Sequence, residues 1–139
     1  MSSIALAALS ILVADDEESI RHLLCSWLTS RGHKVVSVAN AQDAARCLKE
    51  QRFDLVITDV VMPDGDGFEL IGAFRKAQAE TRILAISGGG RFLQGNDCLK
   101  IALGLGAHAV LMKPFGWDQL QAGIDQALVA GDSAAAMSA

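Results

Sequence analysis

Several short apolar runs in this sequence end in side chains that could do chemistry. Four of the runs end, in chain order, in Asp15 and Asp16, in Asp59, in Ser87 and in Lys113. A lone charge at the end of a buried strand is costly unless it has a partner, binds a metal or is exposed. These three carboxylates, one hydroxyl and one ammonium are therefore expected to share a site.

Three carboxylates in one site do not all stay ionised without help. Two like charges about 4 Å apart repel by roughly 4 kcal/mol at an effective dielectric constant of about 20. The site must then either keep a proton, with a raised pKa, or bind a cation. Oxygen ligands with no His or Cys among them favour a hard ion such as Mg²⁺. Such a site, with a lysine and a serine beside it, is arranged to receive a phosphoryl group on one aspartate.

Alternating strands and helices are needed to position these residues. Apolar runs rich in β-branched residues predict strands over 9–14, 33–39, 54–58, 82–86 and 109–112. Apolar residues at helical spacing predict helices over 17–30, 41–51, 68–76, 96–105 and 118–129. Successive parallel strands need a crossover, so this order indicates an α/β fold: a doubly wound five-stranded parallel sheet with five helices. Ligands of such sheets bind outside the carboxyl ends of the strands.

Length and composition indicate one globular domain. The chain has 139 residues, of which 51% are hydrophobic and 20% charged. We expect an N-terminal extension over 1–8, the domain over 9–130 and a disordered tail over 131–139, with no room for an output domain. The net charge of −4 argues against nucleic acid and anionic membranes as partners. The apolar segment over 4–14 lacks the flanks of a signal peptide, so a cytoplasmic protein is expected.

The other ionisable residues have simpler interpretations. Glu17 and Glu18 are interpreted as first-turn acids that the helix dipole favours, rather than as ligands. His22, His33 and His108 are not at paired metal spacing and are expected at the surface or the rim of the site. The cysteines are odd in number and unrelated in spacing, which indicates structural thiols in a reducing compartment: Cys25, Cys47 and Cys98.

The motifs at the strand ends resemble those of the receiver domain of bacterial two-component response regulators. The matching pieces are LVADDEE, DLVITDVVMPDGDGFEL, ILAISG and LMKPF, which stand in the family's order and cover roughly residues 9–129. The resemblance implies a flavodoxin-like fold and a phosphoryl donor that is a sensor histidine kinase or a histidine phosphotransfer protein. It also implies a downstream protein partner, bound through the predicted elements over 96–129. The domain would catalyse only its own phosphorylation and dephosphorylation, and so would not be an enzyme.

The same resemblance implies the roles of individual residues around the phosphoryl group. Asp59 is implied as the phosphoacceptor and Lys113 as the partner of the phosphoryl group. The hydroxyl of Ser87 and the backbone amide of Gly88 are implied as hydrogen-bond donors to its oxygens. The peptide bond between Lys113 and Pro114 is expected to be cis.

The metal assignments follow from the resemblance in the same way. Asp16, Asp59 and the backbone carbonyl of Val61 are implied as direct ligands of Mg²⁺, with Asp15 acting mainly through water. A second function class, a Mg²⁺-dependent phosphohydrolase with an aspartate nucleophile, remains as an alternative. Such enzymes usually carry a second Asp two residues after the nucleophile, where this sequence has Val61, and a cap domain for which the chain has no room.

Two features depart from the family pattern. Many receiver domains carry an aromatic residue on the last strand that turns inward on phosphorylation, whereas this chain has Val110 there and no Tyr at all. The segment over 88–95, GGGRFLQG, is longer than expected and contains three consecutive glycines. We therefore hypothesise that this segment, rather than an aromatic side chain, is the switch.

Overall fold

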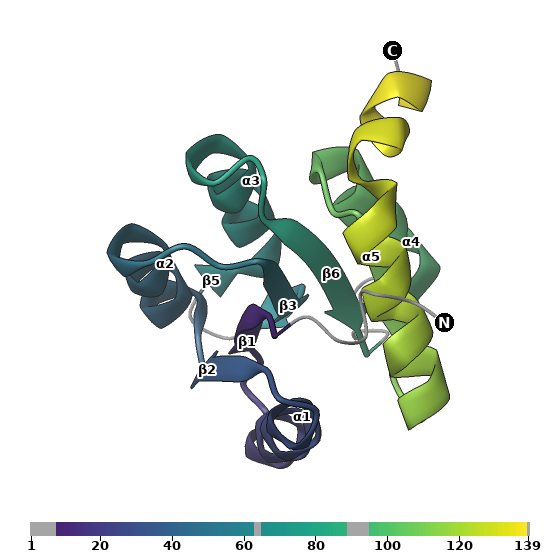
Figure 1. The fold of residues 1–139 in the computed structure, drawn as a ribbon. Helices are drawn as coiled ribbons and strands as arrows, with labels where there is room; N and C mark the ends of the chain where they lie inside the picture. Colours follow the sequence, from purple (N-terminus) through teal and green to yellow (C-terminus); the bar gives the residue numbers. More distant parts are fainter. Residues whose placement is uncertain (1–7, 63–64, 89–94, 139) are drawn as a thin grey trace.

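The fold is a five-stranded parallel sheet between two layers of helices (Figure 1). The computed structural model describes residues 8–62, 65–88 and 95–138. Within these ranges the sheet contains the strands β1 Ser10–Ala14, β2 Lys34–Val38, β3 Leu55–Asp59, β6 Arg82–Ser87 and β7 Ala109–Met112. Their order in the sheet is β2-β1-β3-β6-β7, and every neighbouring pair is parallel. The predicted α/β class and doubly wound topology are confirmed.

Helices cover both faces of the sheet. They are α1 Glu18–Ser30, α2 Ala41–Glu50, α3 Gly67–Ala77, α4 Gly95–Leu105 and α5 Trp117–Ser138. The buried residues of α1 and α5 pack on one face, and those of α2, α3 and α4 on the other (Figure 1). The chain leaves β1 toward β2 and later returns to β3 on its other side, so the strand order reverses at β1. Ligand crevices of open α/β sheets form beside such a reversal.

The central strands are apolar throughout because both of their faces are covered. All five residues of β3 are buried, as are the last four of β1. Side chains alternate between the two faces along each strand. Val56 therefore packs with the α2, α3 and α4 layer, whereas Leu55 and Ile57 pack with α1 and α5. Packing of this core therefore fixes the backbone positions of the polar residues at the ends of these strands.

The last helix is longer than the one predicted over 118–129. The helix α5 continues to Ser138, through the segment that we expected to be a disordered tail. The segment over 131–138 contains no proline, and its three consecutive alanines favour a helix. Residues 1–7, in the predicted extension, lie outside the described residues. In the described part of the chain, no helix combines the length and the apolar character needed to cross a membrane.

His108 is buried, which corrects its predicted place at the surface or the rim. Only 6% of the residue is exposed. Its Nδ1 accepts a hydrogen bond of 3.0 Å from the backbone N–H of Ile83, and its Nε2 lies 3.2 Å from Nη1 of Arg75. His108 precedes β7 and faces the start of β6, so its ring satisfies a buried backbone donor there. His22 is exposed and His33 is partly buried, as a surface or rim position predicts.

The turn after β3 brings the chain close to the end of that strand. Two short antiparallel strands, β4 Val61–Met62 and β5 Gly65–Asp66, lead directly into α3 at Gly67. A Cβ atom at Gly67 would meet the carbonyl oxygen of Asp59 and would lie 2.6 Å from Cα of Val60. Glycine at this position is therefore required by close packing against the backbone that carries Asp59.

We expect Gly67→Ala to lower the free energy of unfolding by about 1–3 kcal/mol, because the added methyl must displace backbone rather than a flexible side chain. Gly72→Ala in the same helix is the matched control, since its Cβ would meet none of the described atoms within 4 Å. The control should raise the free energy of unfolding by about 0.5–1 kcal/mol. Urea unfolding of both variants measures the difference, and equal stabilities would contradict the packing argument.

Candidate functional site

The predicted site residues meet at the carboxyl edge of the sheet. Asp15 follows β1, Asp59 ends β3, Ser87 ends β6 and Lys113 follows β7. Asp15 is 1% exposed, Asp59 5% and Ser87 0%, so this edge is buried around its polar groups. The backbone N–H of Lys113 donates to the carbonyl of Ser87 at 2.8 Å, which fixes the two strand ends to each other. The convergence expected from the parallel sheet is confirmed for Asp15, Asp59 and Lys113.

The ammonium group of Lys113 lies among three carboxylates. Its Nζ is 2.7 Å from Oε1 of Glu17, 3.0 Å from Oδ2 of Asp15 and 3.0 Å from Oδ2 of Asp59. Burial disfavours the charged form of Lys113, but the three carboxylates beside it, Glu17 first, outweigh this effect and raise the pKa of the lysine. The side chain is therefore a permanent cation at neutral pH.

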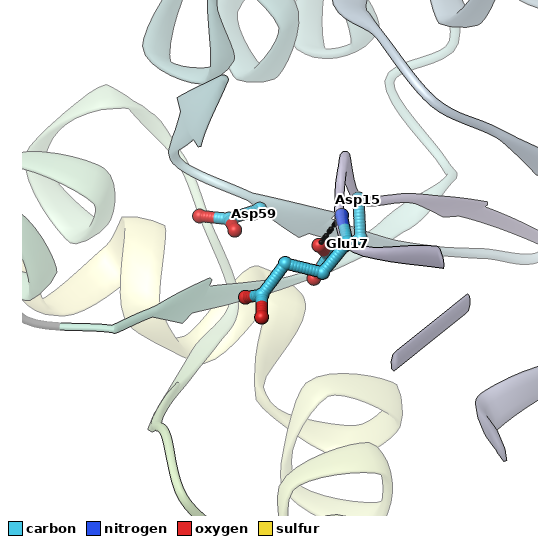
Figure 2. Close-up of side chains that lie close together, drawn as sticks. All are labelled: Asp15, Glu17 and Asp59. Carbon is cyan, nitrogen blue, oxygen red and sulfur yellow. Dashed lines mark hydrogen bonds between the residues drawn. The ribbon is translucent and has the colours of Figure 1, made fainter. Parts of the chain in front are cut away.

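The three carboxylates also form a cluster of their own. One oxygen each of Asp15, Glu17 and Asp59 lies within 4.8 Å of the others (Figure 2). The backbone N–H of Glu17 donates to Oδ1 of Asp15 at 2.9 Å and holds that side chain in place. Burial raises the pKa of Asp15 above its ordinary value, and the nearby charge of Asp59 adds to this effect. The carboxylates of the cluster repel one another, and a bound cation would reduce this repulsion.

The cluster fits a hard divalent cation. Oδ2 of Asp15 is buried and accepts no hydrogen bond from the described residues, although the ammonium of Lys113 is within ion-pair distance. Three carboxylates against one ammonium leave two negative charges, which Mg²⁺ would balance. Carboxylate oxygens are also the ligands that Mg²⁺ prefers. The structure therefore has an acidic cluster of the charge and ligand type that the sequence predicted.

Glu17 belongs to this cluster, and our interpretation of it as only a first-turn acid was wrong. Asp16 is exposed and lies outside the cluster, as far as the described residues show. Glu17 has extended backbone angles, φ −83° and ψ 112°. In extended backbone, side chains two residues apart point to the same side. That spacing places Glu17 on the same side as Asp15 and was the signal in the sequence.

The remaining predictions for the site have different outcomes. The peptide bond between Lys113 and Pro114 is cis, as expected. Gly88 is exposed, and a Cβ there would lie 3.7 Å from Cδ of Lys113, so its backbone borders the site. Val110 packs against the core cluster on the face of α2, α3 and α4. The hypothesis that 88–95 is the switch falls largely on residues 89–94, which lie outside the described residues.

A groove of about 610 Å³ adjoins the acidic cluster. Glu17, Gly88 and Lys113 line its polar end, and its other walls come from α1 and the segment after β7. Leu23 and Trp117 line these walls and remain 52% and 43% exposed. Trp117 stacks on Trp27 of α1, with ring centroids 5.3 Å apart, which joins the two walls. An open, largely apolar surface thus reaches the edge of the site.

Comparison with known proteins identifies the family. Residues 11–125 match the model of the response regulator receiver domain. The chain is 35% identical over 134 residues to the DNA-binding transcriptional regulator NtrC of Azospirillum brasilense, covering 96% of this chain and 27% of that protein. It is 34% identical over 125 residues to the transcriptional regulatory protein AfsQ1 of Streptomyces coelicolor, covering 88% of this chain and 52% of that protein. The chain thus spans between about a quarter and a half of these relatives.

Solved structures agree with this assignment. The chemotaxis protein CheY4 of Vibrio cholerae is 29% identical, with a TM-score of 0.76 over 88% of this chain and 100% of that one. NtrX from Brucella abortus is 28% identical, with a TM-score of 0.81 over 95% of this chain and 29% of that one. In this chain, the acidic cluster and Lys113 lie at the edge of a sheet whose fold these proteins share. The chain belongs to the family of response regulator receiver domains.

We expect Mg²⁺ to raise the melting temperature at pH 7, because ligand binding to the folded state stabilises it. Folding raises the pKa of Asp15, so ionised Asp15 destabilises the fold once the pH exceeds its unfolded value of 3.8. A bound ion offsets this destabilisation only where Asp15 is ionised. The rise in melting temperature on adding Mg²⁺ should therefore shrink as the pH falls through the raised pKa of Asp15.

Asp15→Asn should lose most of the Mg²⁺-dependent rise at pH 7. Removing a metal ligand or its immediate support typically weakens affinity by about tenfold or more. Asp125→Asn, which changes an exposed aspartate of α5, is the control and should keep the full rise. Thermal unfolding with and without MgCl₂ measures both, and an equal rise in the two variants would show that the ion binds elsewhere.

Proposed function

We propose that this domain takes a phosphoryl group from a phosphohistidine onto Asp59 in a Mg²⁺-dependent reaction and then signals through protein contacts. The observation that carries the proposal is the position of Asp59. Its Oδ2 lies 3.0 Å from Nζ of Lys113, beside the buried carboxylate of Asp15. This arrangement joins a carboxylate nucleophile to a fixed positive charge at the end of a rigid strand.

The chemistry requires little beyond positioning and charge compensation. An oxygen of the Asp59 carboxylate attacks the phosphorus, a P–O bond forms, and the P–N bond to the donor imidazole breaks with its electron pair leaving on nitrogen. Lys113 compensates the negative charge of the transferred group. The hydroxyl of Ser87 and the amide of Gly88 are proposed as donors to its oxygens.

The metal assignment remains part of the proposal. Asp16, Asp59 and the carbonyl of Val61 are the proposed direct ligands, with Asp15 acting through water. Because Mg²⁺ keeps several waters, the buried Asp15 can act through one of them without moving. When bound, the ion supplies positive charge to the phosphoryl oxygens at the moment of transfer.

The surfaces beside the site suit two kinds of protein partner. The groove along α1 is proposed to bind the sensor kinase or histidine phosphotransfer protein, since it is apolar and opens next to the phosphoacceptor. The face of α4 and β7 is proposed for the downstream partner. Ile101, Leu105 and Met112 are 40–43% exposed there, which is unusual for side chains of this size.

Acetyl phosphate should label the wild-type protein at one phosphoryl group per chain, and Asp59→Ala should abolish labelling. Asp125→Ala is the matched control and should be labelled like the wild type. Intact-mass spectrometry in the presence of Mg²⁺ measures all three. Retained labelling in Asp59→Ala would refute the assignment of the phosphoacceptor. Multiple turnover of small phosphoesters would instead favour the phosphohydrolase.

Leu23→Glu should slow phosphotransfer from the cognate histidine donor by about tenfold, because it places a charge in the proposed docking groove. Labelling by acetyl phosphate should be unchanged, since this small donor does not need the groove. Val129→Glu, at an exposed position of α5 away from the groove, should behave like the wild type. Equal transfer rates in both variants would place the donor on another surface.

A further inference from the structure

Glu17 stands at the start of α1 but does not serve the helix as a cap. It is the N-cap residue, and among the described contacts its side chain makes no capping hydrogen bond. Residues that accept such a bond, above all Ser, Thr, Asp and Asn, are preferred here. Its backbone is nevertheless fixed, because its N–H donates to Asp15 and its carbonyl accepts from the N–H of Arg21. The side chain of Glu17 can therefore change its rotamer without moving the helix.

The carboxylate of Glu17 forms an ion pair with Lys113 instead. At 2.7 Å it is the nearest of the three carboxylates to the ammonium, against 3.0 Å for Asp15 and Asp59. It also differs in exposure, since 55% of the Glu17 side chain is exposed, compared with 1% for Asp15 and 7% for Asp59. Lys113 therefore has two buried partners and one partner in contact with water.

A phosphoryl group on Asp59 would change this balance. An ammonium has three N–H donors, and three carboxylates already surround the one on Lys113. A phosphoryl group replaces the carboxylate of Asp59 as one partner, and its additional charged oxygens compete with Asp15 and Glu17 for the ammonium. Separating Lys113 from Asp15 would leave a buried charge unpaired, which is strongly unfavourable. Separating it from Glu17 costs little, because water can hydrate the released carboxylate.

We propose that Glu17 is a positioning residue that holds Lys113 while Asp59 is unphosphorylated and releases it when the phosphoryl group arrives. This inference rests on the proposed function of Asp59. Glu17 and Lys113 both line the polar end of the groove along α1. Release therefore places a free carboxylate beside the apolar walls and changes the surface that a partner meets. Such a change requires no aromatic residue at Val110.

The inference predicts that Glu17→Gln binds a phosphoryl mimic more tightly. With Mg²⁺ present, its affinity for beryllofluoride should rise by about two- to fivefold, the value of one partly exposed ion pair. Glu18→Gln is the matched control, because it removes the same charge one residue away and none of the described ion pairs includes Glu18. An affinity of Glu17→Gln equal to or weaker than that of the control would overturn the proposal.

A direct measurement follows the carboxylate itself. In carbon-13 NMR spectra, the side-chain carboxyl signal of Glu17 should move on addition of beryllofluoride toward its position in Lys113→Ala, where no ammonium holds it. The signal of Glu18 should not move. A Glu17 signal that stays in place when beryllofluoride is bound would mean that the ion pair is kept, and the proposal would be wrong.

These experiments separate the inference from the function on which it rests. If the wild type binds no beryllofluoride, the proposed phosphoacceptor site fails and the inference fails with it. If the wild type binds but Glu17→Gln matches Glu18→Gln, only the inference fails. Without beryllofluoride, a loss of Mg²⁺ affinity in Glu17→Gln more than tenfold larger than in Glu18→Gln would identify Glu17 as a metal ligand. That result would also overturn its role as a releasable partner of Lys113.

Discussion

The contact between one ammonium group and three carboxylates at the sheet edge is the interaction on which the rest of the site depends. Lys113 is the cation that lets Asp15 and Asp59 stay so near each other in a buried place. A single ammonium does not balance three carboxylates, so the edge keeps an excess of negative charge. That excess makes the cluster suited to a divalent cation.

The fold provides this contact by bringing strand ends together. Residues more than fifty positions apart along the chain meet because β1, β3, β6 and β7 are adjacent and parallel. The core on both faces of the sheet fixes where each strand ends, and the glycine that begins α3 lets that helix pack directly on the backbone of Asp59. The favourable packing of the two core clusters thus offsets the unfavourable free energy of the charges at the edge.

The site is also connected to surfaces that other proteins can reach. Glu17 and Lys113 belong both to the charged cluster and to the wall of the groove along α1. A change in the charge at Asp59 therefore acts on Lys113, which itself lines the largely apolar groove. This proximity gives the proposed phosphorylation of Asp59 a short physical route to altered partner binding.

The sequence by itself determined the α/β class, the doubly wound parallel sheet and the main chemical groups. Apolar runs ending in Asp15, Asp59, Ser87 and Lys113 could be interpreted because runs of this kind form buried strands, and parallel strand ends share an edge. The tertiary structure alone showed that Glu17 joins the cluster, that His108 is buried against the start of β6 and that a groove opens along α1. Each of these depends on the direction of one side chain or on the distance between separate elements. Hydrophobic periodicity reports which segments are buried and carries no information about those distances, so only the folded chain decides them.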